Sequence, residues 1–200
     1  MERNPNFKID DEVYGKFGEK DFEEYILSLN YCFLNVSDIE IYQLADIDFL
    51  VSPSLDLPCY GLDGINNHEL IYNREVNKRN IYKFEVKTDT RAFITRNVVY
   101  EIISHDSAGC LGESKADYVY YVFVDDTSGE IIKKEVWSIN LSKWRKYLRE
   151  HFFETKVSLK ESRGTWGIIK NNYNIHGDCV ANLLCNIDML KKNGVAKKVY

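Results

Sequence analysis

The stretch YVYYVFVDD at residues 118–126 constrains the fold most strongly, because it is almost continuously apolar and aromatic. A strand that alternates apolar and polar residues covers a core with one face, whereas a continuously apolar strand needs cover on both faces. We therefore predict that residues 118–126 form a central strand of a sheet. The TSG that follows predicts a turn, and EIIKKEVWSIN after it predicts the second strand of a hairpin.

Helices are predicted on either side of this hairpin. Apolar residues recur at helical spacing in EKDFEEYILSLNYCFL, namely at Phe22, Tyr25, Ile26 and Leu29. The segment LSKWRKYLREHFFE follows the hairpin and has Asn140 or Ser142 as its N-cap. The C-terminal segment HGDCVANLLCNIDMLKKNG is predicted as a third helix that ends at Gly194.

Further strands are predicted at 80–87, 97–104 and WGIIKN, and a strand or strand pair in SDIEIYQLADIDFLVS. Residues 52–80 contain two of the three Pro residues, two Gly and several Asn, which favours a long connection. The order of elements predicts an α/β or α+β fold with a central mixed sheet flanked by helices. We expect one domain over residues 1–200, with an insertion at about 52–80.

Charge and cysteine content exclude several protein classes. A net charge of −5 excludes a broadly basic protein, so a nucleic-acid partner would have to be met by a local basic patch. The five Cys residues form no CxxC pair and no zinc-type cluster, which indicates reduced thiols inside a cell. The sequence shows neither an apolar signal region nor an apolar run of membrane-spanning length. We expect a cytoplasmic protein without a membrane partner.

Two opposite charges stand inside the predicted strand YKFEVKTDT. Glu85 and Lys87 are two residues apart and share one face of the strand, while Phe84 and Val86 share the other. Placing charges in an apolar setting costs desolvation free energy unless something compensates. A divalent cation bound by carboxylates is one such compensation.

A second source of carboxylates lies upstream in ADIDFLV. Asp46 and Asp48 alternate with apolar residues there, and Asp48 leads directly into an apolar run. Either carboxylate could be a metal ligand. If the two strands pair, Asp48 and Glu85 can converge on one Mg²⁺ or Mn²⁺ ion, with the Val86 carbonyl and water completing its octahedral shell.

Asp48 followed by Glu85-Val86-Lys87 resembles the signature of the PD-(D/E)xK nuclease superfamily, which has the restriction-endonuclease-like fold. The text TDTRAFITRNVVYEIIS and then GCLGESKADYVYYVF is similar to small phage-borne or bacterial members of that group. The resemblance covers roughly residues 13–170. Two departures are that Ile47, and not Pro, precedes Asp48, and that residues 52–80 are inserted between the two motifs.

The resemblance implies a metal-dependent nuclease that hydrolyses phosphodiester bonds, with DNA as the expected substrate. The bound Mg²⁺ or Mn²⁺ would polarise a phosphoryl oxygen and lower the pKa of a bound water, which Lys87 would orient or help to deprotonate. The implied catalytic residues are Asp48, Glu85 and Lys87. The implied metal ligands are Asp48, Glu85, the Val86 carbonyl and Glu101, with Glu19 and Asp46 as auxiliary acids.

The same resemblance suggests how nucleic acid is met. Basic residues are dense near the ExK strand, and Lys83, Arg91 and Arg96 are candidate phosphate contacts. Cutting both strands of DNA with one site per chain requires a homodimer or two successive nicks. The expected setting is the cytoplasm of a bacterium or of a phage-infected host.

Plainer explanations exist for each of these residues. Glu85 and Lys87 could form an ordinary surface ion pair, Glu19 could interact only with its helix dipole, and Glu101 could be a solvated strand residue. The alternative function is a catalytically inactive protein of the nuclease fold that binds nucleic acid. A further alternative is one that binds a protein partner, for example as an inhibitor of a host or phage system.

Overall fold

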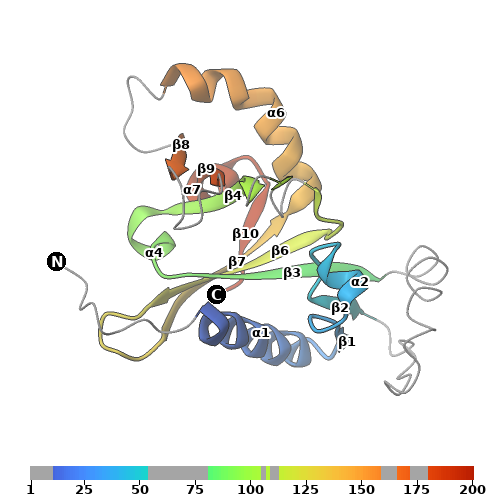
Figure 1. Ribbon diagram of the computed structural model, residues 1–200. Helices are drawn as coiled ribbons and strands as arrows, with labels where there is room; N and C mark the ends of the chain where they lie inside the picture. Colours follow the sequence, from blue (N-terminus) through green and yellow to red (C-terminus); the bar gives the residue numbers. More distant parts are fainter. Residues whose placement is uncertain (1–10, 54–80, 105–106, 109–112, 159–165, 172–179) are drawn as a thin grey trace.

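The computed structural model describes residues 11–53, 81–104, 107–108, 113–158, 166–171 and 180–200. Within these ranges the chain is a mixed α/β structure with two β-sheets (Figure 1). Helix α1 lies along one face of the larger sheet, and the smaller sheet with α6 and α7 lies on the other side. The predicted central mixed sheet flanked by helices is therefore confirmed. From residue 54 onward, the insertion predicted at about 52–80 lies outside the described residues.

The larger sheet has six strands in the order β1-β2-β3-β6-β7-β10. Neighbouring strands are antiparallel except for β3 and β6, which are parallel, so the sheet is mixed. The strands are β1 (Cys32–Asn35), β2 (Phe49–Ser52), β3 (Tyr82–Asp89), β6 (Tyr118–Asp125), β7 (Ile132–Asn140) and β10 (Ala196–Lys198).

The smaller sheet has four antiparallel strands in the order β5-β4-β9-β8. The strands are β4 (Asn97–Ser104), β5 (Ser107–Ala108), β8 (Trp166–Asn171) and β9 (Val180–Asn186). The helices among the described residues are α1 (Asp11–Ser28), α2 (Glu40–Gln43), α4 (Ala92–Thr95), α6 (Leu141–Ser158) and α7 (Ile187–Lys192). Among the described residues, no helix has both the length and the apolar character that crossing a membrane requires.

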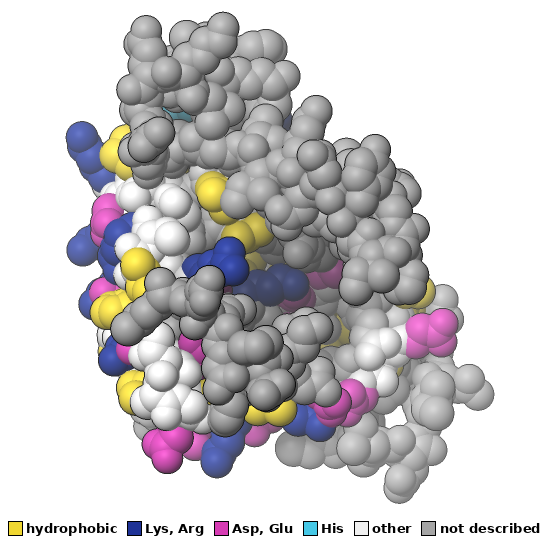
Figure 2. All heavy atoms as spheres, turned by 60° about the vertical axis from the view of Figure 1, so that its left-hand side comes forward, with side chains coloured by type: hydrophobic (Ala, Val, Ile, Leu, Met, Phe, Trp, Pro, Cys, Tyr) yellow, Lys and Arg dark blue, Asp and Glu magenta, His cyan; other side chains and the backbone are white. Residues whose placement is uncertain are grey.

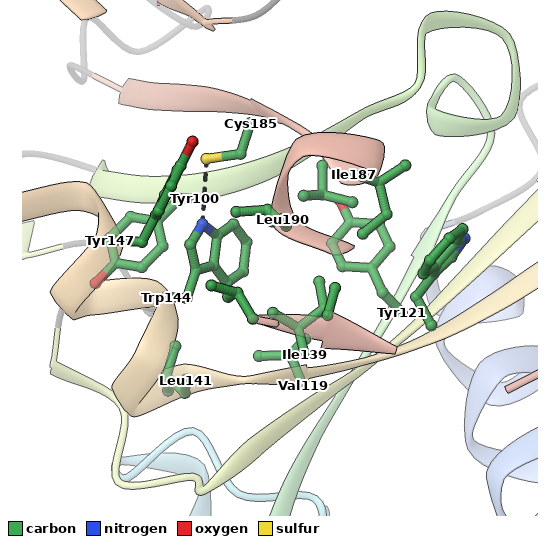
Figure 3. Close-up of a cluster of buried hydrophobic side chains, with 14 of the residues drawn as sticks. Tyr100, Val119, Tyr121, Ile139, Leu141, Trp144, Tyr147, Cys185, Ile187 and Leu190 are labelled. Carbon is green, nitrogen blue, oxygen red and sulfur yellow. Dashed lines mark hydrogen bonds between the residues drawn. The ribbon is translucent and has the colours of Figure 1, made fainter. Parts of the chain in front are cut away.

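Strand β6 lies in the middle of the larger sheet and separates two cores. Its side chains at 120, 122 and 124 pack with Phe22 and Ile26 of α1. Those at 119, 121 and 123 belong to a second core with Trp144 of α6 and Cys185 of β9. The Trp144 Nε1–H donates to Cys185 Sγ at 3.2 Å inside this second core (Figure 3). Burial on both faces, as the apolar sequence of β6 predicts, is confirmed.

A buried polar network also fixes α1 to the sheet. Asp21 is 7% exposed, and its Oδ2 accepts hydrogen bonds from the hydroxyls of Tyr120 at 3.0 Å and Tyr200 at 2.8 Å. Its Oδ1 lies 2.5 Å from the Lys133 ammonium. Because every carboxylate oxygen has a donor, the network offsets the desolvation cost of burying Asp21.

Three predicted elements differ from the structure in type or extent. The first helix does not continue to Leu34, because Asn30 adopts a left-handed conformation (φ 54°) and the chain turns into β1. The region around Ile39 and Ile41 is not a strand but contains the helical turn α2, which buries Tyr42. Residues 180–186 are not helical but form β9, because they pair with β4 and β8. A short apolar run fits either element, and sheet pairing decides between them.

The predicted strands at 80–87, 97–104, 118–126 and WGIIKN, and the second hairpin strand, are confirmed as β3, β4, β6, β8 and β7. The predicted helix after the hairpin is α6, and the Asn140 side chain accepts a hydrogen bond from the Lys143 N–H at 2.8 Å as its N-cap. Gly194 follows α7 with a φ of 67°, as expected at a helix end.

Helix α1 crosses β3 at close range. Gly18 is buried at the crossing, and a Cβ at this position would overlap Thr88 Oγ1 and approach Val86 Cγ1 to 3.1 Å. Gly15 lies one turn earlier and is exposed, and a Cβ there would meet nothing within 4 Å. The absent side chain of Gly18 therefore sets the distance between α1 and the strand that carries Glu85.

We expect Gly18→Ala to lower the free energy of unfolding by about 1–3 kcal/mol, because the added methyl overpacks the α1–β3 contact. Gly15→Ala is the matched control and should raise stability by up to about 1 kcal/mol, since alanine favours an exposed helix. Urea denaturation of the two variants tests this. A Gly18→Ala midpoint equal to or above that of Gly15→Ala would contradict the close packing.

Candidate functional site

Asp48 lies at the start of β2, next to the middle of β3. Strand β2 pairs with β3 so that Phe49 is opposite Phe84, and the Asp48 N–H donates to the Phe84 carbonyl at 2.9 Å. The Asp48 Oδ2 accepts a hydrogen bond from the Val86 N–H at 2.7 Å. These two hydrogen bonds hold the Asp48 carboxylate against the edge of β3, just before the first residue of β2.

Glu85 and Lys87 project from β3 on the same face. The Lys87 Nζ lies 2.9 Å from Glu85 Oε1, and Glu85 is only 6% exposed. About one third of the Lys87 side chain is exposed, whereas the Glu85 side chain is almost fully buried. The ion pair of the plainer explanation is present, but the burial of Glu85 makes it unlike an ordinary surface pair.

The electrostatics show that Asp48, Glu85 and Lys87 act on one another. The pKa of Asp48 is raised to about 8, first by burial and second by the negative charge of Glu85. The hydrogen bond from the Val86 N–H and the positive charge of Lys87 lower the pKa and oppose this shift. The structure therefore brings together the three side chains that the sequence singled out.

The backbone of Val86 faces the same edge as Asp48. In β3, the N–H and C=O of Lys83 both bond to Asp117 ahead of β6, so the odd-numbered residues direct their backbone groups toward β6. The backbone groups of Val86 point the opposite way, as its bond to Asp48 confirms. The Val86 carbonyl thus lies on the Asp48 side of β3, where the sequence places a metal ligand.

The donor set at this edge fits a hard divalent cation. Asp48 and Glu85 supply two carboxylates and Val86 supplies a carbonyl oxygen. Mg²⁺ is often bound through one or two carboxylates, with water and substrate phosphates as the remaining ligands. Within the described ranges, no group of three or more His, Cys, Asp or Glu side chains could hold a metal.

The two auxiliary acids are placed differently from Asp48. Glu19 is on α1, where Ser37 Oγ lies 3.3 Å from its Oε2, and its charge contributes least to raising the pKa of Asp48. Burial raises the pKa of Glu19 itself. Asp46 lies in the turn before β2 with a φ of 49°, and its carbonyl accepts a hydrogen bond from Ser114 Oγ at 3.2 Å.

Glu101 does not lie on the sheet that carries this site. It belongs to β4 of the smaller sheet, where its backbone is opposite Asn182 of β9. The placement of its side chain is outside the described part of the structure. Its role as a further metal ligand stays a prediction.

The three candidate phosphate contacts have different surroundings. Arg96 pairs with Glu135 at 3.0 Å and with Asp188 at 2.9 Å, so it joins β7 to α7. The Lys83 ammonium is 3.6 Å from the Asp117 carboxylate, and the exposed Arg91 precedes α4. Arg96 is thus held by two carboxylates, Lys83 lies near one, and Arg91 is exposed.

Asp89 is a residue of this face that the sequence reasoning missed. It follows Glu85 and Lys87 at two-residue spacing, and that spacing was the signal that could have found it. Its Oδ1 accepts from the N–H groups of Arg91 and Ala92, and its Oδ2 accepts from the Tyr121 hydroxyl at 3.0 Å. Asp89 therefore fixes the turn from β3 into α4.

Charged side chains gather in a hollow on one face of the molecule. Figure 2 shows Lys and Arg side chains in this hollow, with Asp and Glu side chains beside them. Because the net charge of the chain is −5, a basic region on its surface can only be local, and the basic side chains of this hollow lie beside acidic ones.

No protein-family model, curated protein or solved structure matches the chain.

The raised pKa of Asp48 predicts how stability depends on pH. Folded Asp48 keeps its proton up to about pH 8, while the unfolded residue loses it near its ordinary pKa of 3.8. The folded state therefore binds more protons between these values, and stability falls as the pH rises through this range. We expect Asp48→Asn to remove this loss, and each unit of pKa shift is worth about 1.4 kcal/mol.

Urea denaturation of wild type and Asp48→Asn at pH 5 and pH 8 measures the effect. Wild type should lose at least about 1.4 kcal/mol more than the variant between the two conditions. Equal losses in the two proteins would show that Asp48 ionises normally in the fold.

Proposed function

We propose that this protein is a metal-dependent nuclease that hydrolyses phosphodiester bonds of nucleic acid, with DNA as the expected substrate. The observation that carries the proposal is the meeting of Asp48, Glu85 and Lys87 at one edge of β3. Two neighbouring carboxylates, of which Glu85 is buried, and an ammonium beside them are costly to maintain for stability alone. The arrangement agrees with the PD-(D/E)xK resemblance of the same residues.

Asp48 and Glu85, with the Val86 carbonyl, are the groups that would hold Mg²⁺ or Mn²⁺. When bound, the cation would neutralise charge on the phosphoryl oxygens and make a bound water more acidic. The raised pKa of Asp48 supports this assignment. Burial and the negative charge of Glu85 disfavour the ionised form of Asp48, and a bound cation would stabilise that form.

Lys87 is the residue that would act on the substrate. Glu85 holds its ammonium at 2.9 Å, and the exposed third of the side chain lets the ammonium donate a hydrogen bond to a phosphate or to the attacking water. The buried Glu85 thereby has two roles, since it would bind the cation and orient Lys87. Asp48 is kept in place by the Val86 N–H, so its second oxygen can turn toward the cation.

We expect wild type to cleave plasmid or single-stranded DNA only when Mg²⁺ or Mn²⁺ is present. Glu85→Gln and Lys87→Ala should each reduce the cleavage rate by at least about 100-fold, because they remove a metal ligand and a proton-handling group. Gel electrophoresis of the products over time measures the rates. Lys146→Ala, an exposed residue of α6, is the control and should cleave like wild type.

Wild type that cuts neither substrate, or variants that cut as fast as wild type, would overturn the nuclease proposal. Urea denaturation of each variant shows whether a lost activity reflects lost folding.

Metal binding can be tested without activity. At pH 7, Mn²⁺ should raise the melting temperature of wild type and release protons, because the cation favours the ionised form of Asp48. Asp48→Asn should lose most of this stabilisation. Calorimetric titration in buffers of different ionisation enthalpy measures the proton release. A similar response in wild type and Asp48→Asn would remove Asp48 from the metal site.

The second candidate function is a protein of the same fold that binds nucleic acid or a protein partner without cutting. One observation favours it, namely that the described residues contain no cluster of three or more metal-ligating side chains. This candidate predicts affinity that does not depend on Mn²⁺. The calorimetric titration with Mn²⁺ therefore separates the two functions.

A further inference from the structure

An open polar pocket of about 1030 Å³ lies at the starts of β3 and β6, the end of β7 and the first turns of α6. The side chains that give it chemical character are Lys83, Lys115, Arg145, Asp117, Ser142 and Tyr82. Neither Asp48 nor Glu85 lines it, so the pocket is distinct from the candidate metal site.

The pocket is nevertheless adjacent to that site. Lys83 lies on the same face of β3 as Glu85, two residues before it. The pocket wall at Ser114 and Lys115 is joined to the segment before Asp48, because the Lys115 N–H donates to the Ala45 carbonyl at 2.8 Å and Ser114 Oγ donates to the Asp46 carbonyl at 3.2 Å. Residues 45–48 are thus hydrogen-bonded to the pocket wall at one end and carry the Asp48 carboxylate at the other.

The charges around the pocket favour an anion. Three cations and two carboxylates line it, and the Asp117 carboxylate is already engaged by the backbone N–H and the ammonium of Lys83. Lys115 is exposed, and the other carboxylate, Glu113, is exposed at the rim. Arg145 donates to the Ser114 carbonyl at 2.6 Å, which fixes its guanidinium at the wall.

The start of α6 adds to this preference. The helix has 18 residues, and its N-terminus carries the positive end of the helix dipole. Asn140 and Ser142, at this N-terminus, line the pocket. Ser142 is exposed and presents a hydroxyl that can donate to a phosphate oxygen. Tyr82 is 41% exposed and offers an aromatic ring beside these polar groups.

We propose that this pocket binds a phosphate-bearing nucleotide of a single nucleic-acid strand. Lys115, Arg145 and Ser142 contact its phosphate, and Tyr82 packs against its base. The assignment of this nucleotide as a neighbour of the cleaved bond rests on the proposed nuclease function. The binding itself does not, because it is measured without metal and without cleavage.

The test uses the full chain carrying Glu85→Gln, with no divalent cation present. The probe is a short oligothymidylate with a 5′-phosphate and a 3′-fluorescein, followed by fluorescence anisotropy over a range of salt concentrations. Lys115→Glu is added to reverse the charge of a residue that lines the pocket. Lys146→Glu is the matched control, because it makes the same change of charge at an exposed residue that does not line the pocket.

We expect Lys115→Glu to raise the Kd about tenfold and to reduce the salt dependence by one phosphate contact, a slope change of about 0.7. Lys146→Glu should leave the Kd within about twofold of the parent. Titration of a 5′-phosphorylated thymidine dinucleotide by calorimetry should show the same difference, since one nucleotide with its phosphate occupies the pocket.

No binding to the Glu85→Gln parent, or equal weakening by the two charge reversals, would overturn the pocket proposal. If wild type fails to cleave but the probe still binds in a Lys115-dependent way, the nuclease proposal fails and the pocket stands. If wild type cleaves DNA but Lys115→Glu binds the probe as tightly as Lys146→Glu does, the pocket proposal fails and the nuclease proposal stands.

Discussion

The burial of β6 on both faces is the constraint on which the rest of the structure depends. One face of the strand packs on α1 and the other on the core around Trp144, so two layers must cover the larger sheet. A parallel neighbour, β3, can then lie against β6 with its own even-numbered residues under α1. The position of β3 in turn fixes where Glu85 and Lys87 emerge.

The candidate site exists because β2 begins at Phe49, opposite Phe84, and so leaves the edge of β3 uncovered at Val86. Asp48 takes the place of a paired strand residue there and satisfies the Val86 N–H with its side chain. This local need places a carboxylate beside the buried Glu85, and the resulting repulsion and burial raise the pKa of Asp48. Structural completion of the sheet edge and the proposed cation chemistry therefore use the same residue.

The pocket near α6 and the site at Asp48 share their supports. The segment at Ser114 and Lys115 is bonded to the turn at Asp46, where the positive φ lets the chain reverse before Asp48. A strand of nucleic acid that occupies the pocket would therefore meet a surface whose backbone is continuous with the site. Arg96, in contrast, joins β7 and α7 through two carboxylates, which gives this arginine a structural explanation.

The sequence by itself determined the central strand, the hairpin that follows it and the face shared by Glu85 and Lys87, because strand alternation and continuous apolar runs are local properties. It misassigned residues 180–186 and the region of Ile39, where a short apolar segment fits either a helix or a strand until a partner is present. Only the tertiary structure decided that Asp48 lies beside Glu85, and that Glu101 lies on another sheet. Those outcomes depend on strand pairing between distant segments, which no local pattern specifies.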